Sequence, residues 1–514
     1  MNIAELVAEK TKGAPDRLAL VLGSREVTYL ELDTLAAKIG AWLIGQGVKP
    51  RDSVLFYSTN SIEFLATYLG TARIGAVFAP AHPSFQREEL SYVATNAEPA
   101  IAFVSADLAN DFERFARTIP ELPAKVVVVG ESSGRRWTSF DDIVASVGNA
   151  AIVDLPADWP VLISYTSGST STPKPVLRSH GAELWSARSY AKVFDYRAED
   201  RALIALPLSW VYGLSTTTSA LLAAGATVVL LPKFNPVHVL NEIERSKITL
   251  FSGSNTMFVK LLEVYREKPS NLSTLRHCYT GAEPINRLVT DEFERLIGSR
   301  IWEGYAATEA FPVLATMPEV DSEAPRETCG QLVPGAQIRL VDSDGRPVPE
   351  GEIGEAQFTC PGRMLEYYKH PDLTSERLTR DGWVRSGDLL RRDQDGYYFV
   401  VGRLNDMIIR GGANIAPPEV EAALIGLDGV VDATVVSIPD QSYGEAVVAF
   451  VSTDGTPTNS AKLSAQLRDR LAVYKIPTLF FVDIPLPSGG NGKLNRRAVA
   501  ALALKLSASE SQPV

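Results

Sequence analysis

Cysteine is scarce in this sequence, which contains only three such residues among 514. Cys278, Cys329 and Cys360 are too few and too scattered for a disulfide framework or a cysteine-based metal cluster. Their scarcity suits a reducing compartment, and we expect the protein to be cytoplasmic. The first residues also lack the basic segment and apolar core that together mark a secretory signal peptide.

An excess of positive charge is absent as well. The formal net charge is -11, with 50 lysines and arginines against 61 aspartates and glutamates. This balance disfavours nucleic acid and anionic membrane as partners. The uncharged segment 202–231 is no membrane span, because Pro207, Gly213 and the hydroxyl residues at 215–219 interrupt it. We therefore expect an enzyme that acts on a small molecule.

The apolar pattern of the sequence predicts alternating strands and helices. At 514 residues the chain exceeds the size at which one hydrophobic core stops growing, so we expect at least two domains. Buried strands are predicted at 100–104, 125–129, 202–208, 227–231, 248–252 and 275–280. Helices are predicted at 29–43, 61–72, 214–223, 236–245, 256–267 and 284–296. Such alternation is typical of parallel sheets with crossover helices.

The sequence from residue 337 onward has a different texture, rich in Asp-Gly and Glu-Gly pairs that indicate tight turns. We expect a small antiparallel barrel at about 330–402, a domain boundary at 403–406 and a smaller α+β domain at 407–514. The predicted fold class is α/β, with residues 1–402 forming a large N-terminal domain of doubly wound sheets that includes the barrel.

The stretch 164–174, Ser-Tyr-Thr-Ser-Gly-Ser-Thr-Ser-Thr-Pro-Lys, follows an apolar run at 159–163 that predicts a buried strand. Hydroxyl groups and free backbone N–H groups around Gly168 are typical of a nest for phosphate oxygens, and Lys174 adds a cation. It is not a Walker A loop, because Lys174 stands between two prolines. Taken alone, a loop of this composition is more often a flexible connection, so its assignment depends on the other motifs.

Three short segments should lie at the same edge of the sheet as this loop, which we call the rim. Ligands of parallel sheets gather beyond the carboxyl ends of the strands. That rule brings together residues 209–212, 253–254 and 281–283, each of which follows a predicted strand. We expect a binding pocket along this rim.

Several motifs occur together in an order that identifies a family. They are the loop at 165–174, Gly-Tyr-Ala-Ala-Thr-Glu at 304–309, Ser-Gly-Asp at 386–388, Gly-Arg-Leu-Asn-Asp and its continuation at 402–421, and Gly-Lys at 492–493. Through them the chain resembles the adenylate-forming superfamily of acyl-CoA synthetases, stand-alone adenylation domains and luciferases, over nearly its whole length. The resemblance implies two steps: a carboxylate attacks ATP to give acyl-AMP and pyrophosphate, and a thiol then displaces AMP.

The resemblance also implies which residues bind ATP. The β- and γ-phosphates would be held by Thr166, Ser167, Gly168, Ser169, Thr170 and Lys174. Gly281, Ala282 and Glu283 match the adenine-binding strand end, and Tyr305, between Gly304 and Ala306, would be the platform on which adenine stacks. Thr308 and Lys493 would contact the α-phosphate. Asp388 would accept both ribose hydroxyls, and Arg403 would contact ribose and phosphate.

Catalytic roles carry over in the same way. Glu309 would hold Mg²⁺, a hard cation suited to one carboxylate plus phosphate oxygens and waters. Lys493 would bridge the attacking carboxylate and the α-phosphate, with Thr166 and Lys174 assisting at the phosphates. Asn405 would be the hinge between two domain orientations, and Gly412 would lie at the tunnel for the thiol.

The residues matched to the acid pocket are Trp210, Val211, Tyr212, Gly253, Ser254, Gly281 and Ala306. Amino-acid-activating relatives hold the substrate ammonium with an aspartate, but Tyr212 stands in that place and segment 202–231 contains no acidic residue. Burying an unpaired ammonium costs several kcal/mol. We therefore expect a largely apolar acid, aliphatic or aromatic.

Four departures from the family pattern stand out. Ser171 and Pro175 replace glycines of the phosphate loop, Asn405 replaces the usual Asp or Lys of the hinge, and Trp210 replaces a histidine. Alternatives therefore stay open. The thiol is coenzyme A or the phosphopantetheine of an acyl or peptidyl carrier protein, which could be loaded with an acyl, aryl or amino acid. A luciferase-like oxygenase and a non-catalytic nucleotide-binding protein are remoter alternatives.

Overall fold

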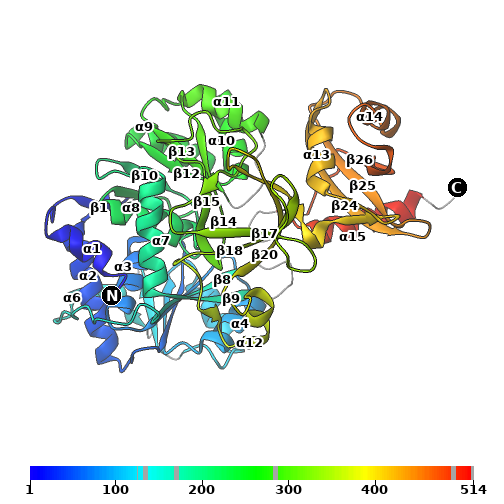
Figure 1. Ribbon diagram of the computed structural model, residues 1–514. Helices are drawn as coiled ribbons and strands as arrows, with labels where there is room; N and C mark the ends of the chain where they lie inside the picture. The colour runs from blue at the N-terminus through cyan, green and yellow to red at the C-terminus, as the bar shows by residue number, and fades with distance from the viewer. Residues whose placement is uncertain (124, 131–136, 167–172, 282–286, 488–493, 511–514) are drawn as a thin grey trace. The chain divides into compact units, whose positions relative to one another are not determined.

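The computed structural model describes residues 1–123, 125–130, 137–166, 173–281, 287–487 and 494–510. Its contacts divide the chain into two compact units (Figure 1). The first consists of Met1–Ile338 and Phe358–Val384, and the second of Arg339–Gln357 and Arg385–Val514. Each unit is described by itself below.

One sheet of the first unit carries the regular alternation that the sequence predicts. Its nine described strands follow the order β16-β15-β14-β13-β12-β10-β11-β1-β2, and the pairs from β14 to β1 are parallel. They are β16 (Gln331–Leu332), β15 (Ala310–Ala315), β14 (Ile301–Ala307), β13 (His277–Gly281), β12 (Leu250–Ser252), β10 (Arg201–Ile204), β11 (Thr227–Leu230), β1 (Leu18–Leu22) and β2 (Arg25–Thr28). The crossover helices are α8 (Ser219–Ala224), α9 (Pro236–Arg245), α10 (Asn255–Glu267) and α11 (Arg287–Ile297). The predicted parallel sheet is confirmed.

A second sheet of this unit contains the hairpin that presents the phosphate loop. Its eight described strands follow the order β19-β9-β8-β4-β3-β5-β6-β7. They are β19 (Glu366–Tyr367), β9 (Lys174–Ser179), β8 (Pro160–Thr166), β4 (Val77–Ala81), β3 (Ser53–Tyr57), β5 (Ile101–Ser105), β6 (Val126–Val129) and β7 (Thr138–Ser139). The accompanying helices are α2 (Tyr29–Gly45), α3 (Ile62–Arg73), α4 (Arg87–Ala97), α5 (Ala109–Ala116), α6 (Phe140–Ala145) and α7 (His180–Val193). Because β8 and β9 are antiparallel, the loop joins two strands instead of leading into a helix.

The second unit contains two smaller sheets. The region predicted as a small barrel forms a sheet of four described strands, β17 (Gln337–Val341), β18 (Ile353–Thr359), β20 (Val384–Arg392) and β21 (Tyr398–Arg403). The sequence assigned this region to the first domain, whereas its contacts group about half of it, residues 339–357 and 385–402, with the C-terminal residues. The other sheet contains β23 (Ala413–Ile415), β22 (Ile408–Arg410), β25 (Gly444–Thr453), β24 (Val430–Asp440) and β26 (Leu479–Val482).

The long hairpin β24–β25 organises the C-terminal core. Successive strand residues point to opposite faces, so Val435 and Val447 pack with α13 (Pro417–Ile425) and α14 (Ser460–Leu467). Val436 and Val448 pack on the other face with α15 (Arg496–Glu510). This α+β arrangement is the one that the sequence predicts. Within the described ranges, no helix has both the length and the apolar character needed to cross a bilayer.

Buried imidazoles should make the first unit sensitive to acid. Burial and the nearby N-terminal amino group lower the pKa of His180 to about 3, and its Nδ1 accepts the Ile3 N–H at 3.0 Å. Burial also lowers the pKa values of His82 and His277 to about 4. The unfolded chain therefore binds these protons at a higher pH than the folded chain does. As a result, the free energy of unfolding decreases as the pH falls below about 6.5.

We expect His180 alone to lower the free energy of unfolding by about 1.4 kcal/mol per pH unit between roughly pH 6 and 4. Urea unfolding at pH 7.5, 6 and 5 measures this slope. His180→Gln should flatten the slope, whereas His238→Gln, at an exposed position, should leave it unchanged. If the free energy of unfolding depends on pH equally in His180→Gln and the parent protein, His180 is not the source of this acid sensitivity.

Candidate functional site

The described ends of the phosphate loop are held in register by the β8–β9 hairpin. Thr166 closes β8 and lies opposite Lys174, which opens β9. Pro175 fits this edge because it lies opposite Tyr165 and its carbonyl accepts the Tyr368 N–H at 2.8 Å. The predicted residues Ser167, Gly168, Ser169 and Thr170, and the departure Ser171, lie outside the described residues. The hairpin thus fixes Thr166 and Lys174 at the base of the loop.

The turn after β14 places a buried carboxylate in the same unit. Glu309 follows Thr308 in this turn and is 8% exposed. Its carboxylate accepts a hydrogen bond from the Tyr367 hydroxyl and pairs with Arg377 Nε at 3.0 Å. Burial alone would raise the pKa of Glu309, but the charge of Arg377 and the Tyr367 hydrogen bond outweigh it and lower the pKa. Glu309 is therefore held as an anion.

Lys174 connects this carboxylate with the hairpin. Its ammonium lies 5.5 Å from the centre of the Tyr367 ring, the same ring whose hydroxyl binds Glu309. Tyr367 comes from β19 and Arg377 from the end of α12 (Pro371–Arg377), segments that the sequence did not single out. Two cations and one carboxylate thus gather beside the loop predicted to bind phosphates.

Mg²⁺ fits this donor set. The described residues contain no group of three or more His, Cys, Asp or Glu side chains that could enclose a metal. A single anionic carboxylate suits Mg²⁺, which keeps waters and takes phosphate oxygens from its substrate. Glu309 would hold the ion, which would neutralise phosphate charge when bound.

The predicted adenine site lies where β13 and β14 approach each other closely. Gly281 lies opposite Gly304, and a Cβ atom at Gly281 would be 2.6 Å from the Gly304 carbonyl oxygen. Tyr305, the predicted adenine platform, is half-buried and meets Phe358 edge to face with ring centroids 6.2 Å apart. Ala306 continues β14, whereas Ala282 and Glu283 lie outside the described residues.

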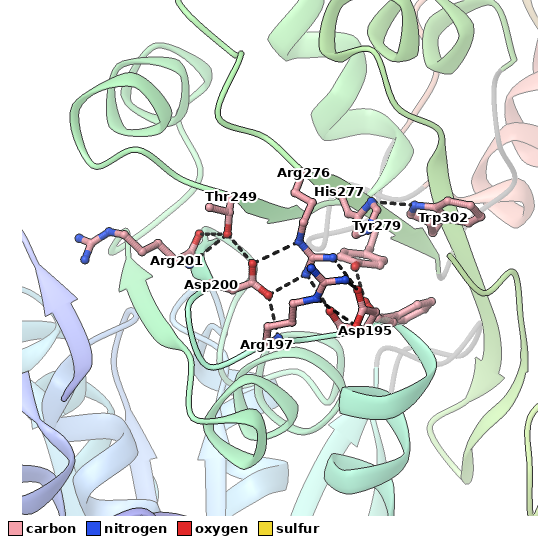
Figure 2. A network of polar contacts seen from close by, with 10 residues as sticks. Asp195, Arg197, Asp200, Arg201, Thr249, Arg276, His277, Tyr279 and Trp302 are labelled. Atoms are coloured by element: carbon pink, nitrogen blue, oxygen red, sulfur yellow. Dashed lines mark hydrogen bonds and ion pairs between the residues drawn. The ribbon is translucent and has the colours of Figure 1, made fainter. Parts of the chain in front are cut away.

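A polar network fixes these two strands at their starting ends (Figure 2). Arg276, directly before β13, pairs with Asp195 at 2.8 Å and with Asp200 at 2.7 Å. The indole N–H of Trp302 on β14 donates to Nδ1 of His277 at 3.2 Å. Because strand register sets where each strand ends, this network helps to place Gly281 and Gly304.

The segment predicted to line the acid pocket begins a π-helix, η1 (Tyr212–Thr218). The Tyr212 hydroxyl donates to the Gly253 carbonyl at 3.2 Å, and Trp210 stacks on His82 with ring centroids 5.1 Å apart. Val211 lies between these anchored aromatic residues. Gly213 lets the helix start close to the preceding loop. A Cβ atom at this position would lie 2.2 Å from the Pro207 carbonyl oxygen.

Gly253, Ser254 and His82 lie next to these residues in the sequence or in the fold. A Cβ atom at Gly253 would lie 2.9 Å from the Phe251 ring, so this glycine permits close packing instead of leaving open depth. Ser254 is the N-cap residue of α10. His82 follows β4 in the other sheet, and no motif in the sequence identifies it as a neighbour of Trp210.

The second unit brings together the predicted ribose-binding residues. Asp388 on β20 lies opposite Arg403 on β21, and Arg403 Nε is 2.9 Å from the Asp388 carboxylate. Asn405 is exposed in the short helix η2 (Leu404–Asp406), and Gly412 has a φ of 86° in the turn after β22. Lys493 lies outside the described residues.

Comparisons with known proteins cover the chain almost completely. A family model described as AMP-binding enzyme matches residues 7–368, and one described as AMP-binding enzyme C-terminal domain matches residues 419–493. Indoleacetate–CoA ligase of Aromatoleum aromaticum is 31% identical over 511 residues, covering 98% of this chain and 99% of that protein. Feruloyl-CoA synthase of an Amycolatopsis species is 34% identical over 493 residues, covering 94% and 96%.

Solved structures give the same result for the fold. ATP-bound MatB of Rhodopseudomonas palustris is 27% identical, with a TM-score of 0.90, and the match covers 98% of this chain and 100% of that one. The match extends over nearly every residue of both chains.

Proposed function

Because this chain belongs to the AMP-binding enzyme family of adenylate-forming ligases, we propose that it activates a largely apolar carboxylic acid with ATP and transfers the acyl group to coenzyme A. In the first step the carboxylate attacks the α-phosphate, forming acyl-AMP and releasing pyrophosphate. In the second step the thiol attacks the acyl carbon, forming a thioester and releasing AMP.

The observation that carries the proposal is the charge cluster of Lys174, Glu309, Tyr367 and Arg377. A triphosphate needs fixed cations and a metal ligand close together, because charge develops on its oxygens as the α-phosphate reacts. Lys174 and Thr166 would bind the β- and γ-phosphates at the base of the hairpin, and Glu309 would hold Mg²⁺. Thr308 would contact the α-phosphate.

The resemblance assigns further ATP-binding roles to residues of the second unit. Asp388 would accept hydrogen bonds from the ribose hydroxyls, with Arg403 beside it. Lys493 would bring the acid carboxylate and the α-phosphate together, which is the costly part of joining two anions. Asn405 would act as the hinge and Gly412 would line the thiol path. These roles come from the resemblance and stay predictions.

Coenzyme A is the acceptor we propose, because the two relatives above are named as a CoA ligase and a CoA synthase. The names of those relatives, indoleacetate and feruloyl, also support an aromatic acid over an aliphatic one. The stacked rings of His82 and Trp210, close in sequence to Tyr212, would form an aromatic wall for such an acid. The three cysteines are buried and free, which suits a cytoplasmic enzyme.

The acid is expected to lack an α-amino group. Trp210, Val211 and Tyr212 supply no carboxylate for a substrate ammonium, and an unpaired buried ammonium should lower affinity by about a thousandfold. Pyrophosphate release would be measured with pairs of acids that differ only in the amino group, such as phenylalanine and 3-phenylpropanoate. Higher kcat/KM for the amino acid would contradict the proposed substrate class.

A further inference from the structure

A fully buried ion pair lies directly behind the turn that carries Glu309. Arg178 on β9 and Glu183 on α7 are both 0% exposed, and Arg178 Nε donates to the Glu183 carboxylate. Ser186, one helical turn after Glu183, accepts a hydrogen bond from Arg178 Nη2 at 3.3 Å. The Tyr68 hydroxyl donates to the second oxygen of Glu183 at 3.5 Å.

This buried group bonds to the main chain of the turn. Arg178 Nη1 donates to the Thr308 carbonyl at 3.3 Å, and the Ser186 hydroxyl donates to the Phe311 carbonyl at 2.8 Å. The guanidinium carbon lies 3.7 Å from the centre of the Phe311 ring. On the other side, the Met364 N–H donates to the Glu309 carbonyl at 2.7 Å. The carbonyls of residues 308, 309 and 311 are therefore each held by a donor.

Stability alone does not explain why the Arg178–Glu183 pair is buried. Two charges lose their hydration on burial, and an apolar pair of similar volume is often at least as stable. A guanidinium nevertheless offers five N–H donors in a rigid fork, so Arg178 can bind Glu183 along one edge and Thr308 with another nitrogen. No apolar side chain can hold the Thr308 carbonyl.

We propose that Arg178 and Glu183 form a positioning pair for adenylation, which fixes the turn at Thr308 and Glu309 in the geometry that binds Mg²⁺ and ATP. Arg178 acts through the main chain and does not itself touch the nucleotide. The inference rests on the proposed function, because it takes Glu309 as the ligand of Mg²⁺. Lys174 and Arg178 both lie on β9. This one strand therefore positions the lysine predicted to bind phosphates and the arginine that holds the turn.

The test is the double variant R178M/E183M, which removes both charges and leaves neither partner unpaired. Displacements of about 1 Å in an active site can cost 10²-fold in rate. We expect at least a tenfold rise in KM for MgATP, a similar fall in kcat for pyrophosphate release and less than a twofold change in KM for the acid. Calorimetric titration with MgATP should show the same loss of affinity without any turnover.

A matched control lies elsewhere in the first unit. Arg73 and Asp33 form a largely buried pair, joined at 2.6 Å, and R73M/D33L removes it in the same way. This control should change the melting temperature and leave MgATP affinity unchanged. Arg178→Lys keeps the charge but loses the fork, so it should stay folded and still bind MgATP weakly.

Each outcome decides the inference. Wild-type MgATP affinity and Mg²⁺ dependence in R178M/E183M, or in Arg178→Lys, would overturn it, as would an equal loss in the R73M/D33L control. If R178M/E183M does not fold, Ser186→Ala carries the test, with a smaller but parallel loss of MgATP affinity. An enzyme that turns over no acid at all would refute the proposed function, while the calorimetric comparison would still decide the role of the pair.

Discussion

Replacing Lys493 by alanine is expected to lower the rate of acyl-adenylate formation by about 10²–10³-fold, the usual cost of removing one preorganised charge. The acid carboxylate and the α-phosphate are both anions, and a lysine between them lowers the cost of bringing them together. By the resemblance that assigns Lys493, this residue leaves the site when the C-terminal domain turns for the second step. The variant should therefore form thioester normally from a supplied acyl-adenylate.

The two half-reactions separate this role from a structural one. Pyrophosphate exchange measures adenylation, and AMP release from synthetic acyl-adenylate and coenzyme A measures transfer. Lys505→Ala removes an exposed lysine of α15 and should affect neither reaction. Equal losses in both half-reactions of Lys493→Ala would assign Lys493 a general structural role.

Glu309→Gln should also lower pyrophosphate release by about 10²–10³-fold, and it should raise the Mg²⁺ concentration needed for half-maximal rate. The amide keeps the shape of the side chain but loses the charge that the metal requires. Tyr367→Phe removes one donor to this carboxylate and leaves its charge, so a smaller loss of about tenfold is expected.

Glu63→Gln is the matched control for this substitution. Glu63 on α3 is another buried glutamate of the first unit, paired at 2.7 Å with Arg25, whose side chain is largely exposed. It should leave the Mg²⁺ dependence unchanged. A Glu309→Gln enzyme with the parent's Mg²⁺ dependence would show that Glu309 does not hold the metal.

Much of the fold follows from periodicity in the sequence. Apolar runs alternating with amphipathic segments predict the parallel strands β10 to β13 and helices such as α9, whose bounds agree with the prediction. Periodicity does not reveal the π-helix, because the residues of η1 are apolar or small on all sides. Its start at Tyr212 depends on the contact between Gly213 and Pro207, which lies in a preceding loop.

The domain division depends on contacts that the sequence does not show. The motif at 402–406 predicts a hinge, and the short turns before it predict a separate antiparallel region. The contacts of that region divide it about equally between the two units, and no motif in its sequence indicates this division. The hinge at Asn405 stays a prediction.

The candidate site was predictable where motifs carry the chemistry. Lys174, Glu309 and Asp388 each stand in a recognisable pattern, and the comparisons confirm the family that those patterns indicate. Arg377 and His82 belong to segments without a motif, so only the folded chain shows that they meet Glu309 and Trp210.

We propose above that the protein is an AMP-forming ligase that joins an apolar acid to coenzyme A. Mass spectrometry of the products formed from ATP, Mg²⁺, coenzyme A and an aromatic acid such as indoleacetate or ferulate tests it most directly. We expect acyl-CoA, AMP and pyrophosphate in equal amounts. Formation of ADP and phosphate, or acyl transfer to a phosphopantetheinylated carrier protein but not to coenzyme A, would contradict it.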